Sequence, residues 1–539
     1  MVDRVMRSAP YKRRELLMDT KRTAPKQPVR TMYFHVSTTL AAVLAGILLS
    51  LPMASITRAQ TFPPDQIEPP AESAGWKYTE LVSKNSSDHG FSPDIVTGSG
   101  GRQFVAWVET VANTVNRKLL FSQRAAGYGQ SWSTPTLITE IALEGGWYEK
   151  PCPSLAAGGS DLVHIVWTVN RTDSAGGIFY RKYNSQTEAW ESATQVVSGM
   201  TMGCPKLVAN ANDNLHLVWA QSDGVYYRAF DKNLNAWLEA VRLSQTADTY
   251  SEPGLAVGGD GSVHVAWVAG PGGRESTLYY RNRKPGVPWS EVQSIAATKP
   301  AANCTSSTFW RDYPAYVRPG VAADKDGNVH LAWTQMICRL ISVNNVDEAH
   351  ILYKRYSEST GWTADETISG PRPEGKADRH STAPSLAITR SSLYSLLPAS
   401  LGQRLTLHVV WREKTHVWLG SYKNRLWYRN YDSTSGAWSE SYEVQKFDEP
   451  LDGGRFIEFS RPAVSVDSSK FRGVTVHTTW TYQTDLLDSG TDIDVFYRRY
   501  VHTTALVIKR TAIYLAIIAL GGIGAIYGYR RYRSRREVP

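Results

Sequence analysis

The chain has 539 residues, of which 42% are hydrophobic and 20% charged, and its formal net charge is +9. About +6 of this charge lies in residues 1–30 and about +6 in residues 509–537, so the segment between them is slightly acidic, near −3. Because the basic residues gather at the two ends, the charge excludes a basic nucleic-acid-binding domain in the middle of the chain. We expect no nucleic acid, no cofactor and no metal ion among its partners.

The N-terminal segment is typical of export. Residues 1–30 carry nine Lys or Arg against three acidic residues, and an apolar run from Val36 to Leu51 follows, ending near Ala59. A basic region, an apolar region and small residues at a cleavage site make up a signal peptide. We predict a signal peptide over residues 1–59, with an uncleaved signal anchor as the alternative, and a Pro-rich linker over residues 60–73.

Residues 74–502 contain an internal repeat. The stretch DGSVHVAW (260–267) recurs as DLVHIVW (161–167), DNLHLVW (213–219) and DGNVHLAW (326–333). A Pro and an apolar run precede each copy, and an aromatic run such as LYYR (278–281) follows it. These runs are short, β-branched or aromatic and bounded by turn residues, which predicts strands. Alignment on the final Trp gives seven units, marked by Trp107, Trp167, Trp219, Trp267, Trp333, Trp411 and Trp480.

A second Trp begins a fourth strand in six of the units, at Trp132, Trp190, Trp237, Trp289, Trp362 and Trp438. Four strands in each of seven units predict an all-β fold, a seven-bladed β-propeller of four-stranded blades. The seventh unit lacks its second Trp, and Trp76 in WKYTELVS supplies it. We therefore expect this N-terminal strand to be the outermost strand of the seventh blade and to close the ring, since an open ring would leave unpaired strand edges.

A His occupies the same place in the second strand of six units, at His164, His216, His264, His330, His408 and His477. Side chains alternate between the two faces of a strand, and both faces of a blade pack against neighbouring blades. Equivalent positions in different blades therefore point into different interfaces and cannot converge on one metal ion. We predict hydrogen-bonded core histidines.

The turns before the second Trp resemble a known motif. AAGYGQSW (125–132), RKPGVPW (283–289) and STSGAW (433–438) are similar to the Asp-box, S-x-D-x-G-x-x-W, of the BNR-repeat propellers of the sialidase superfamily. The Trp is kept, Gly129 and Gly286 keep the motif's Gly, and its Asp is absent. The resemblance covers about residues 74–502. It implies a propeller and, in the catalytic members, a sugar carboxylate held by three Arg, a Tyr nucleophile activated by Glu, and an Asp acid/base.

Strand alternation places most insertions on one face of the propeller, at residues 297–317, 334–350, 412–425 and 481–492. Long loops gathered on one rim usually build recognition sites. The residue before each first-strand Pro should ring the mouth of the central channel on this face: Ser92, Cys152, Cys204, Glu252, Arg318, Ala383 and Arg461.

We predict a ligand site formed by Arg318, Arg461, Glu252, Tyr250, Arg379, His380 and Glu458. An Arg fork binds a carboxylate through two parallel hydrogen bonds. The resemblance would give catalytic roles to Arg318, Arg461, Glu252, Tyr313 and Asp312. This chain departs from the family's F-R-I-P pattern, in which Arg stands two residues before Pro, because Arg318 and Arg461 directly precede theirs.

Three functions remain open on the sequence. The first is a cell-surface propeller that binds an extracellular glycan or protein through its loop-rich face. The second is a sialidase-like exo-glycoside hydrolase with an Arg-lined pocket at the channel mouth. The third is a non-catalytic scaffold for membrane assembly, which a channel mouth sealed by side chains would favour.

The four Cys residues predict two disulfides. Cys152 and Cys204 hold the same place in adjacent units, and Cys304 and Cys338 lie in insertions of one unit, so we expect these two pairs in an oxidising compartment.

The C-terminal segment is typical of a membrane anchor. Residues 512–529 carry no charge, and five Arg follow within residues 530–536. We predict a juxtamembrane segment at 503–511, a membrane-spanning helix at 512–529 and a basic cytoplasmic tail at 530–539, with the propeller outside the cell.

Overall fold

In a computed structural model the chain divides into two compact parts, Met1–Phe62 and Pro63–Pro539. The described residues all belong to the second part. They are residues 66–67, 76–84, 88–111, 114–127, 129–143, 151–171, 173–244, 249–250, 252–270, 276–298, 319–324, 326–341, 344–370, 379–390, 405–418, 421–433, 435–448, 461–467, 474–484, 492–501, 521–522 and 524–533.

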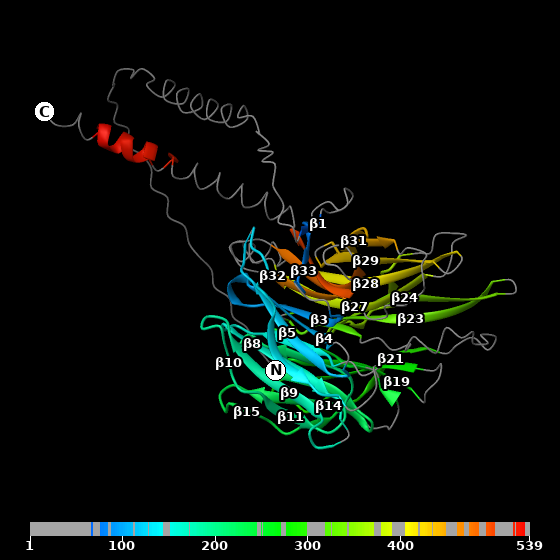
Figure 1. The fold of residues 1–539 in the computed structure, drawn as a ribbon. Coiled ribbons are helices and arrows are strands. Elements are labelled where there is room, and N and C mark those ends of the chain that lie inside the picture. The colour runs from blue at the N-terminus through cyan, green and yellow to red at the C-terminus, as the bar shows by residue number, and fades with distance from the viewer. Residues whose placement is uncertain are drawn as a thin grey trace, which may run out of the picture. The chain divides into compact units, whose positions relative to one another are not determined.

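The described strands form an all-β propeller, in which almost every strand pairs antiparallel with a neighbour along the chain (Figure 1). The first sheet contains β3 (Gly90–Thr97), β4 (Gln103–Thr110), β5 (Arg117–Arg124) and β6 (Thr136–Ile141). The second contains β7 (Pro153–Ala157), β8 (Leu162–Val169), β9 (Gly177–Asn184), β10 (Ala189–Trp190) and β11 (Thr194–Ser198). The third contains β12 (Met202–Ala209), β13 (Leu215–Gln221), β14 (Gly224–Asp231), β15 (Ala236–Trp237) and β16 (Val241–Arg242).

The fourth sheet contains β17 (Thr249–Tyr250), β18 (Gly254–Val257), β19 (Val263–Gly270), β20 (Ser276–Arg283) and β21 (Gln293–Thr298). The fifth contains β22 (Gly320–Ala323), β23 (Val329–Ile341), β24 (Asn344–Ser357), β25 (Gly361–Trp362), β26 (Glu366–Thr367), β27 (Arg379–Arg390), β28 (Leu405–Trp418), β29 (Ser421–Asp432), β30 (Ala437–Trp438) and β31 (Tyr442–Asp448). The sixth contains β32 (Ala463–Asp467), β33 (Thr475–Thr484), β34 (Asp492–Val501), β1 (Gln66–Ile67) and β2 (Thr79–Leu81). A short 3-10 turn, η1 (Ser99–Gly101), connects β3 to β4.

The number of sheets differs from the expected seven separate blades. The described strands form five sheets of four or five strands and one sheet of ten strands. The ten-stranded sheet is continuous because β24 and β27 meet through one parallel pair, Ala349 with His380. The first strands nevertheless follow one another around a common centre: β3, β7, β12, β18, β22, β27 and β32 contact each other in this order, and β32 contacts β3.

The two ends of the propeller sequence are joined by hydrogen bonds, as predicted. Trp76 forms a bridge with Tyr500, and β2 pairs antiparallel with β34, so blue and orange strands share one sheet in Figure 1. The backbone N–H of Val82 donates to the carbonyl of Val495 at 2.8 Å. The prediction of an outermost strand was wrong, because β1, from the expected linker, pairs on the free side of β2.

The six repeated histidines are core residues, as predicted. In each of these six units the His Nδ1 lies 2.7 or 2.8 Å from the hydroxyl of a third-strand Tyr, as for His264 and Tyr280. Burial lowers the pKa of His164, His216, His264 and His330 to about 4. These imidazoles are therefore neutral at pH 7.

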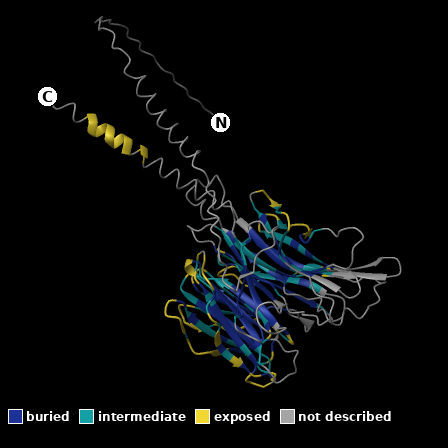
Figure 2. Ribbon diagram, turned by 45° about the horizontal axis from the view of Figure 1, so that its top comes forward, coloured by how far each residue is buried: buried dark blue, intermediate teal, exposed yellow. Residues whose placement is uncertain are grey.

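The second Trp of each unit packs against the third-strand aromatic ring of the preceding unit. Among the described residues the ring centroids lie 4.9–5.5 Å apart in these contacts: Trp132 with Tyr497, Trp190 with Phe121, Trp237 with Tyr180, Trp289 with Tyr227, Trp362 with Tyr280, Trp438 with Tyr353, and Trp76 with Tyr428. The six Tyr rings in this series also make the hydrogen bonds to the histidines. The same His–Tyr–Trp contact therefore recurs between neighbouring units. Figure 2 shows the buried residues along the strands and many of the exposed ones in the turns.

Two of the expected insertions are strands rather than loops. β23 continues to Ile341 and pairs with β24 along its whole length, and β28 and β29 form a similar long hairpin. Residues 334–350 contain several β-branched residues, which favour an extended strand, whereas residues 412–425 contain few.

At the C-terminus, residues 521–522 and 524–533 are helical, and residues 512–520 and 523 of the expected membrane span lie outside the described residues. Among the helices that the structure describes, none is long and apolar enough to cross a membrane.

Candidate functional site

A cavity of about 120 Å³ lies where the first strands converge. Its lining includes residues from β3, β7, β12, β18, β22, β27 and β32 or from the positions just before them. Among the described residues, six of the predicted mouth residues line it: Ser92, Cys152, Cys204, Glu252, Ala383 and Arg461. The sequence rule that selects the residue before each first-strand Pro therefore finds the centre of the propeller.

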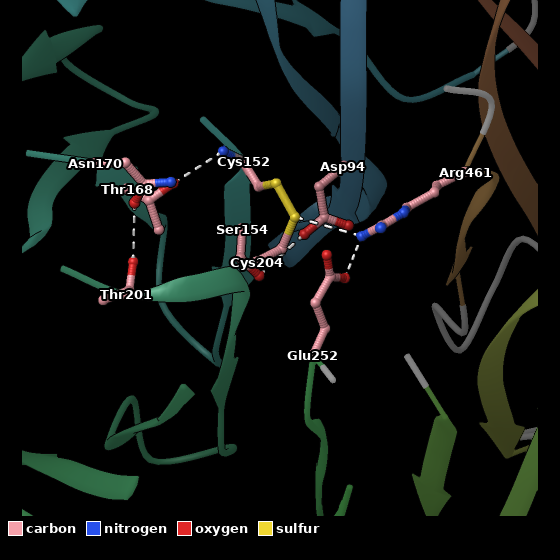
Figure 3. The surroundings of a disulfide bond; sticks show 9 residues. All are labelled: Asp94, Cys152, Ser154, Thr168, Asn170, Thr201, Cys204, Glu252 and Arg461. Carbon is pink, nitrogen blue, oxygen red and sulfur yellow. Dashed lines mark hydrogen bonds and ion pairs between the residues drawn. A yellow bond between two sulfur atoms is a disulfide. The ribbon is translucent and has the colours of Figure 1, made fainter. Parts of the chain in front are cut away.

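The side chains of Arg461 and Glu252 form an ion pair across this cavity (Figure 3). Arg461 precedes β32 and Glu252 precedes β18, so two first strands separate them on one side of the ring and three on the other. The Arg461 Nη1 also donates to Cys204 Sγ at 3.4 Å. The Arg461 side chain stays 40% exposed, whereas that of Glu252 is 9% exposed. The Arg461 side chain thus keeps part of its surface accessible, while the buried Glu252 carboxylate holds its guanidinium.

A second ion pair lines the same cavity. The Asp94 Oδ2 lies 3.3 Å from Lys206 Nζ and accepts hydrogen bonds from the backbone N–H of Leu155 at 2.9 Å and the Ser154 hydroxyl at 3.2 Å. One carboxylate therefore joins β3, β7 and β12. Because its charge is matched by Lys206, it stabilises the wall of the cavity.

Cys152 and Cys204 form a disulfide, as predicted, and their Cα atoms lie 5.2 Å apart. The bond links the starts of β7 and β12, which belong to two different sheets. The backbone N–H of Cys152 donates to the Thr168 hydroxyl at 3.2 Å, which ties the bond to β8. The equivalence of the two positions, inferred from the repeat, is what allowed this pairing to be predicted.

The sulfur atoms of both cysteines and a carboxylate oxygen of Glu252 lie within 4.8 Å of one another. These are atoms of metal-ligating residue types. A disulfide sulfur has no negative charge to donate to a cation, however, and the Arg461 guanidinium already neutralises Glu252. The cluster as it stands is an ion pair beside a disulfide.

The other predicted site residues do not join Arg461 and Glu252 in the described lining. His380 is buried within β27, where it pairs with Lys414. Arg379 pairs with Thr415 in the same ladder, and Tyr250 pairs with Ala269 in β17. Four further candidates, and one cysteine of the second predicted disulfide, lie outside the described residues: Arg318, Asp312, Tyr313, Glu458 and Cys304. Cys338 lies in β23.

Sequence reasoning missed Asp94 and Lys206. Each directly follows the first-strand Pro of its unit, two residues after a predicted mouth position. Both residues line the cavity although β3 is irregular between Phe91 and Asp94 and β12 between Met202 and Lys206, so strict alternation does not account for their position. The signal in the sequence is the charged residue that directly follows the first-strand Pro in these two units alone.

No protein-family model matches the chain, and no curated protein matches it. Solved structures with some similarity include a protein of unknown function from Dyadobacter fermentans, at 11% identity and a TM-score of 0.38, covering 80% of this chain and all of that one. An α-L-arabinanase from Penicillium chrysogenum, complexed with arabinobiose, has 11% identity and a TM-score of 0.36, covering 78% of this chain and 98% of the other.

A leech intramolecular trans-sialidase, complexed with 2,7-anhydro-Neu5Ac, has 11% identity and a TM-score of 0.35, covering 79% of this chain and 70% of the other. Proteins of sialidase and arabinanase type are thus among the similar structures. At these TM-scores the similarity carries no argument about activity, and the propeller assignment rests on the strands of this chain. None of these comparisons identifies BNR repeats in this chain.

Proposed function

We propose that the protein is a carbohydrate-binding propeller that holds an acidic sugar through Arg461 at the central cavity. The observation that carries the proposal is the partly exposed side chain of Arg461, whose guanidinium is held by Glu252 in the lining of that cavity. An engineered apolar cavity of roughly 150 Å³ holds a benzene ring, so a space of about 120 Å³ is of the order needed for one small ring or a carboxylate group. A sugar carboxylate would accept hydrogen bonds from the exposed side of Arg461.

Binding is favoured over hydrolysis by the carboxylates that line the cavity. Glycoside hydrolysis requires a proton donor and a second carboxylate, or an equivalent nucleophile, at the scissile bond. The two described carboxylates of the lining, Asp94 and Glu252, are each paired with a cation. Each carboxylate therefore lies against a cation of the cavity wall. The sialidase-like hydrolase stays the alternative.

A third possibility is a scaffold, and one observation favours it: the Arg461 side chain crosses the cavity to reach Glu252. In that case the ion pair would hold first strands from opposite sides of the ring together, and no ligand would displace it. The scaffold and the receptor differ in whether any glycan binds.

The experiment is a binding measurement with the full chain in its oxidised form. Acidic glycans carrying a terminal uronic or sialic acid are compared with neutral counterparts on an array, and hits are measured by calorimetry. We expect acidic glycans to bind and the Arg461→Gln variant to bind at least tenfold more weakly, since a hydrogen bond to a charged group is worth about 1.5–3 kcal/mol.

The matched control is Arg102→Gln. Arg102 is 37% exposed, close to the 40% of Arg461, and it also bonds to neighbouring groups, but it lies in the turn between β3 and β4. This variant should bind acidic glycans like the parent. Cleavage of fluorogenic glycosides would show that the protein is a hydrolase. An array on which no glycan binds would contradict the proposal and favour the scaffold.

Two finer parts of the proposal concern architecture and location. We infer that the ten-stranded sheet comprises two blades, β22–β26 and β27–β31, which gives seven; the contact of Trp438 with Tyr353 between them repeats the one between other neighbours. We also infer that the propeller is displayed outside the cell, anchored at residues 512–529. The uncharged segment and the five Arg after it support this. Protease added to intact cells should remove the propeller and spare the tail.

A further inference from the structure

The two cysteine sulfurs and the Glu252 carboxylate are metal-ligand types, but while the sulfurs form a disulfide they cannot bind a metal ion. We propose that reduction of Cys152–Cys204 converts this cluster into a site for a thiophilic divalent cation such as Zn²⁺, held by the two thiolates and the Glu252 carboxylate. The inference does not depend on the carbohydrate proposal, which concerns the oxidised protein. It starts from three potential ligand atoms that already lie within 4.8 Å of one another.

The geometry suits tetrahedral coordination. With Zn–S bonds of about 2.3 Å, two thiolates of a tetrahedral site lie about 3.8 Å apart. The Cα atoms of Cys152 and Cys204 are 5.2 Å apart on strands that the ring holds side by side, so side-chain rotation supplies this separation without movement of the backbone. Glu252, just before β18, the next first strand, provides a third ligand, and the cavity leaves the fourth position to water.

Charge supplies the driving force. Two thiolates and one carboxylate carry a charge of −3, which Arg461 alone cannot neutralise. Among the described residues of the lining, the other cation, Lys206, is paired with Asp94. A divalent cation brings the cluster to zero. Arg461 would then hydrogen-bond to the ligands without binding the metal itself. Its Nη1 already contacts Cys204 Sγ and Glu252, and donors of this kind orient the ligands of a metal.

The conversion balances with a phosphine as reductant. The phosphine attacks one sulfur and the S–S bond breaks; water then transfers its oxygen to phosphorus, giving the phosphine oxide and two thiols. The cation binds as both thiols lose their protons, so binding releases two protons for each metal ion. Both Cys residues are 5% exposed and line the cavity, so the reductant approaches from that side.

The experiment uses Co²⁺ as a spectroscopic probe on the full chain carrying Cys304→Ser and Cys338→Ser, which leaves Cys152 and Cys204 as the only cysteines of the four. The protein is reduced with the phosphine, reduction is checked by thiol titration, and Co²⁺ is added anaerobically. We expect thiolate-to-cobalt charge-transfer absorption and tetrahedral d–d bands at one Co²⁺ per chain, both removed by Zn²⁺. The oxidised protein should show neither.

Two variants test the ligand set. Glu252→Gln keeps both thiols and should weaken Co²⁺ binding at least tenfold, whereas Glu188→Gln, an exposed carboxylate away from the cavity, should not. Because Cys204→Ser could fold poorly, the reduced parent is also capped with iodoacetamide, which should abolish the spectrum. Equal binding by oxidised and reduced protein, a spectrum that survives capping, or no Co²⁺ bound to fully reduced protein would each overturn the proposal.

Discussion

Backbone hydrogen bonds and one buried aromatic side chain, Trp76, join the N-terminal strand to the end of the ring, and removal of this side chain is the sharpest test of the closure. Trp76 is 4% exposed, its ring lies 5.4 Å edge-on from Tyr428 and 5.3 Å from Tyr500, and the Arg498 guanidinium lies 5.9 Å from it. Arg498 also donates from Nε to the carbonyl of Lys77 at 2.6 Å. Trp76→Ala removes the packing and keeps the backbone pairing of β2.

The expected cost follows from burial. Truncation of a buried Trp to Ala costs about 3–5 kcal/mol. The indole N–H of Trp76 has no hydrogen-bond partner among the described residues, so no hydrogen bond is lost and the lower half of this range applies. For a propeller of roughly 430 residues, such a loss lowers the melting temperature by about 3–5 °C.

The assay is denaturant unfolding of the full chain, followed by far-UV circular dichroism, with hydrogen exchange to locate the change. The control is Trp237→Ala, whose ring makes the same edge-on contact with Tyr180 at 5.5 Å but closes no ring. Trp76→Ala should increase exchange on both sides of the closure, in β34 and in β3. A loss of stability below about 1 kcal/mol, or exchange confined to β2, would refute the reasoning.

Three further predictions concern the repeated core and the disulfide. Acidification should destabilise the propeller, because burial lowers the pKa of His164, His216, His264 and His330 from 6.5 to about 4 in the folded state, so the unfolded chain binds more protons between these pH values. Each His should then lower the free energy of unfolding by about 1.4 kcal/mol per pH unit as the pH falls from about 6.5 to about 4, as measured by denaturation at fixed pH values. Constant stability over this range would contradict the assignment of neutral core histidines. Tyr280→Phe should cost about 1–3 kcal/mol, because it leaves His264 Nδ1 buried without its 2.7 Å partner, and a neutral result in urea unfolding would mean that this bond adds nothing. Replacing Cys152 and Cys204 together by Ser should cost about 4 kcal/mol by loop-closure entropy for a separation of 52 residues, and unchanged denaturation midpoints under oxidising conditions would show that the ring itself restrains β7 and β12.

Local chemistry made much of the fold predictable. The aligned Trp residues, the Pro before each first strand and the turn residues between runs define strands by short-range properties: side-chain shape, alternation and backbone preference. The repeat then placed equivalent residues at equivalent heights, which was sufficient to predict the Cys152–Cys204 bond, the six core histidines and the role of Trp76. These features depend on neighbouring units alone.

The candidate site was predictable only in part. Arg461, Glu252 and the two cysteines were found because one position per unit was followed around the ring. Their contacts were not: the Arg461–Glu252 pair joins residues 209 positions apart and on opposite sides of the centre. Which cation meets which carboxylate depends on side-chain length and on distances across the cavity, and the repeat pattern contains neither.

The sequence by itself determined that this chain forms a ring of β-sheet units, closed by hydrogen bonds between its ends, because periodicity and alternation are properties of the chain. Only the tertiary structure decided where the sheets divide, that residues 334–350 and 412–425 extend hairpins, and that β1 pairs on the free side of β2. Each of these outcomes depends on which backbone groups find partners after the units pack together. The same holds for the cavity, whose charges meet only when the first strands converge.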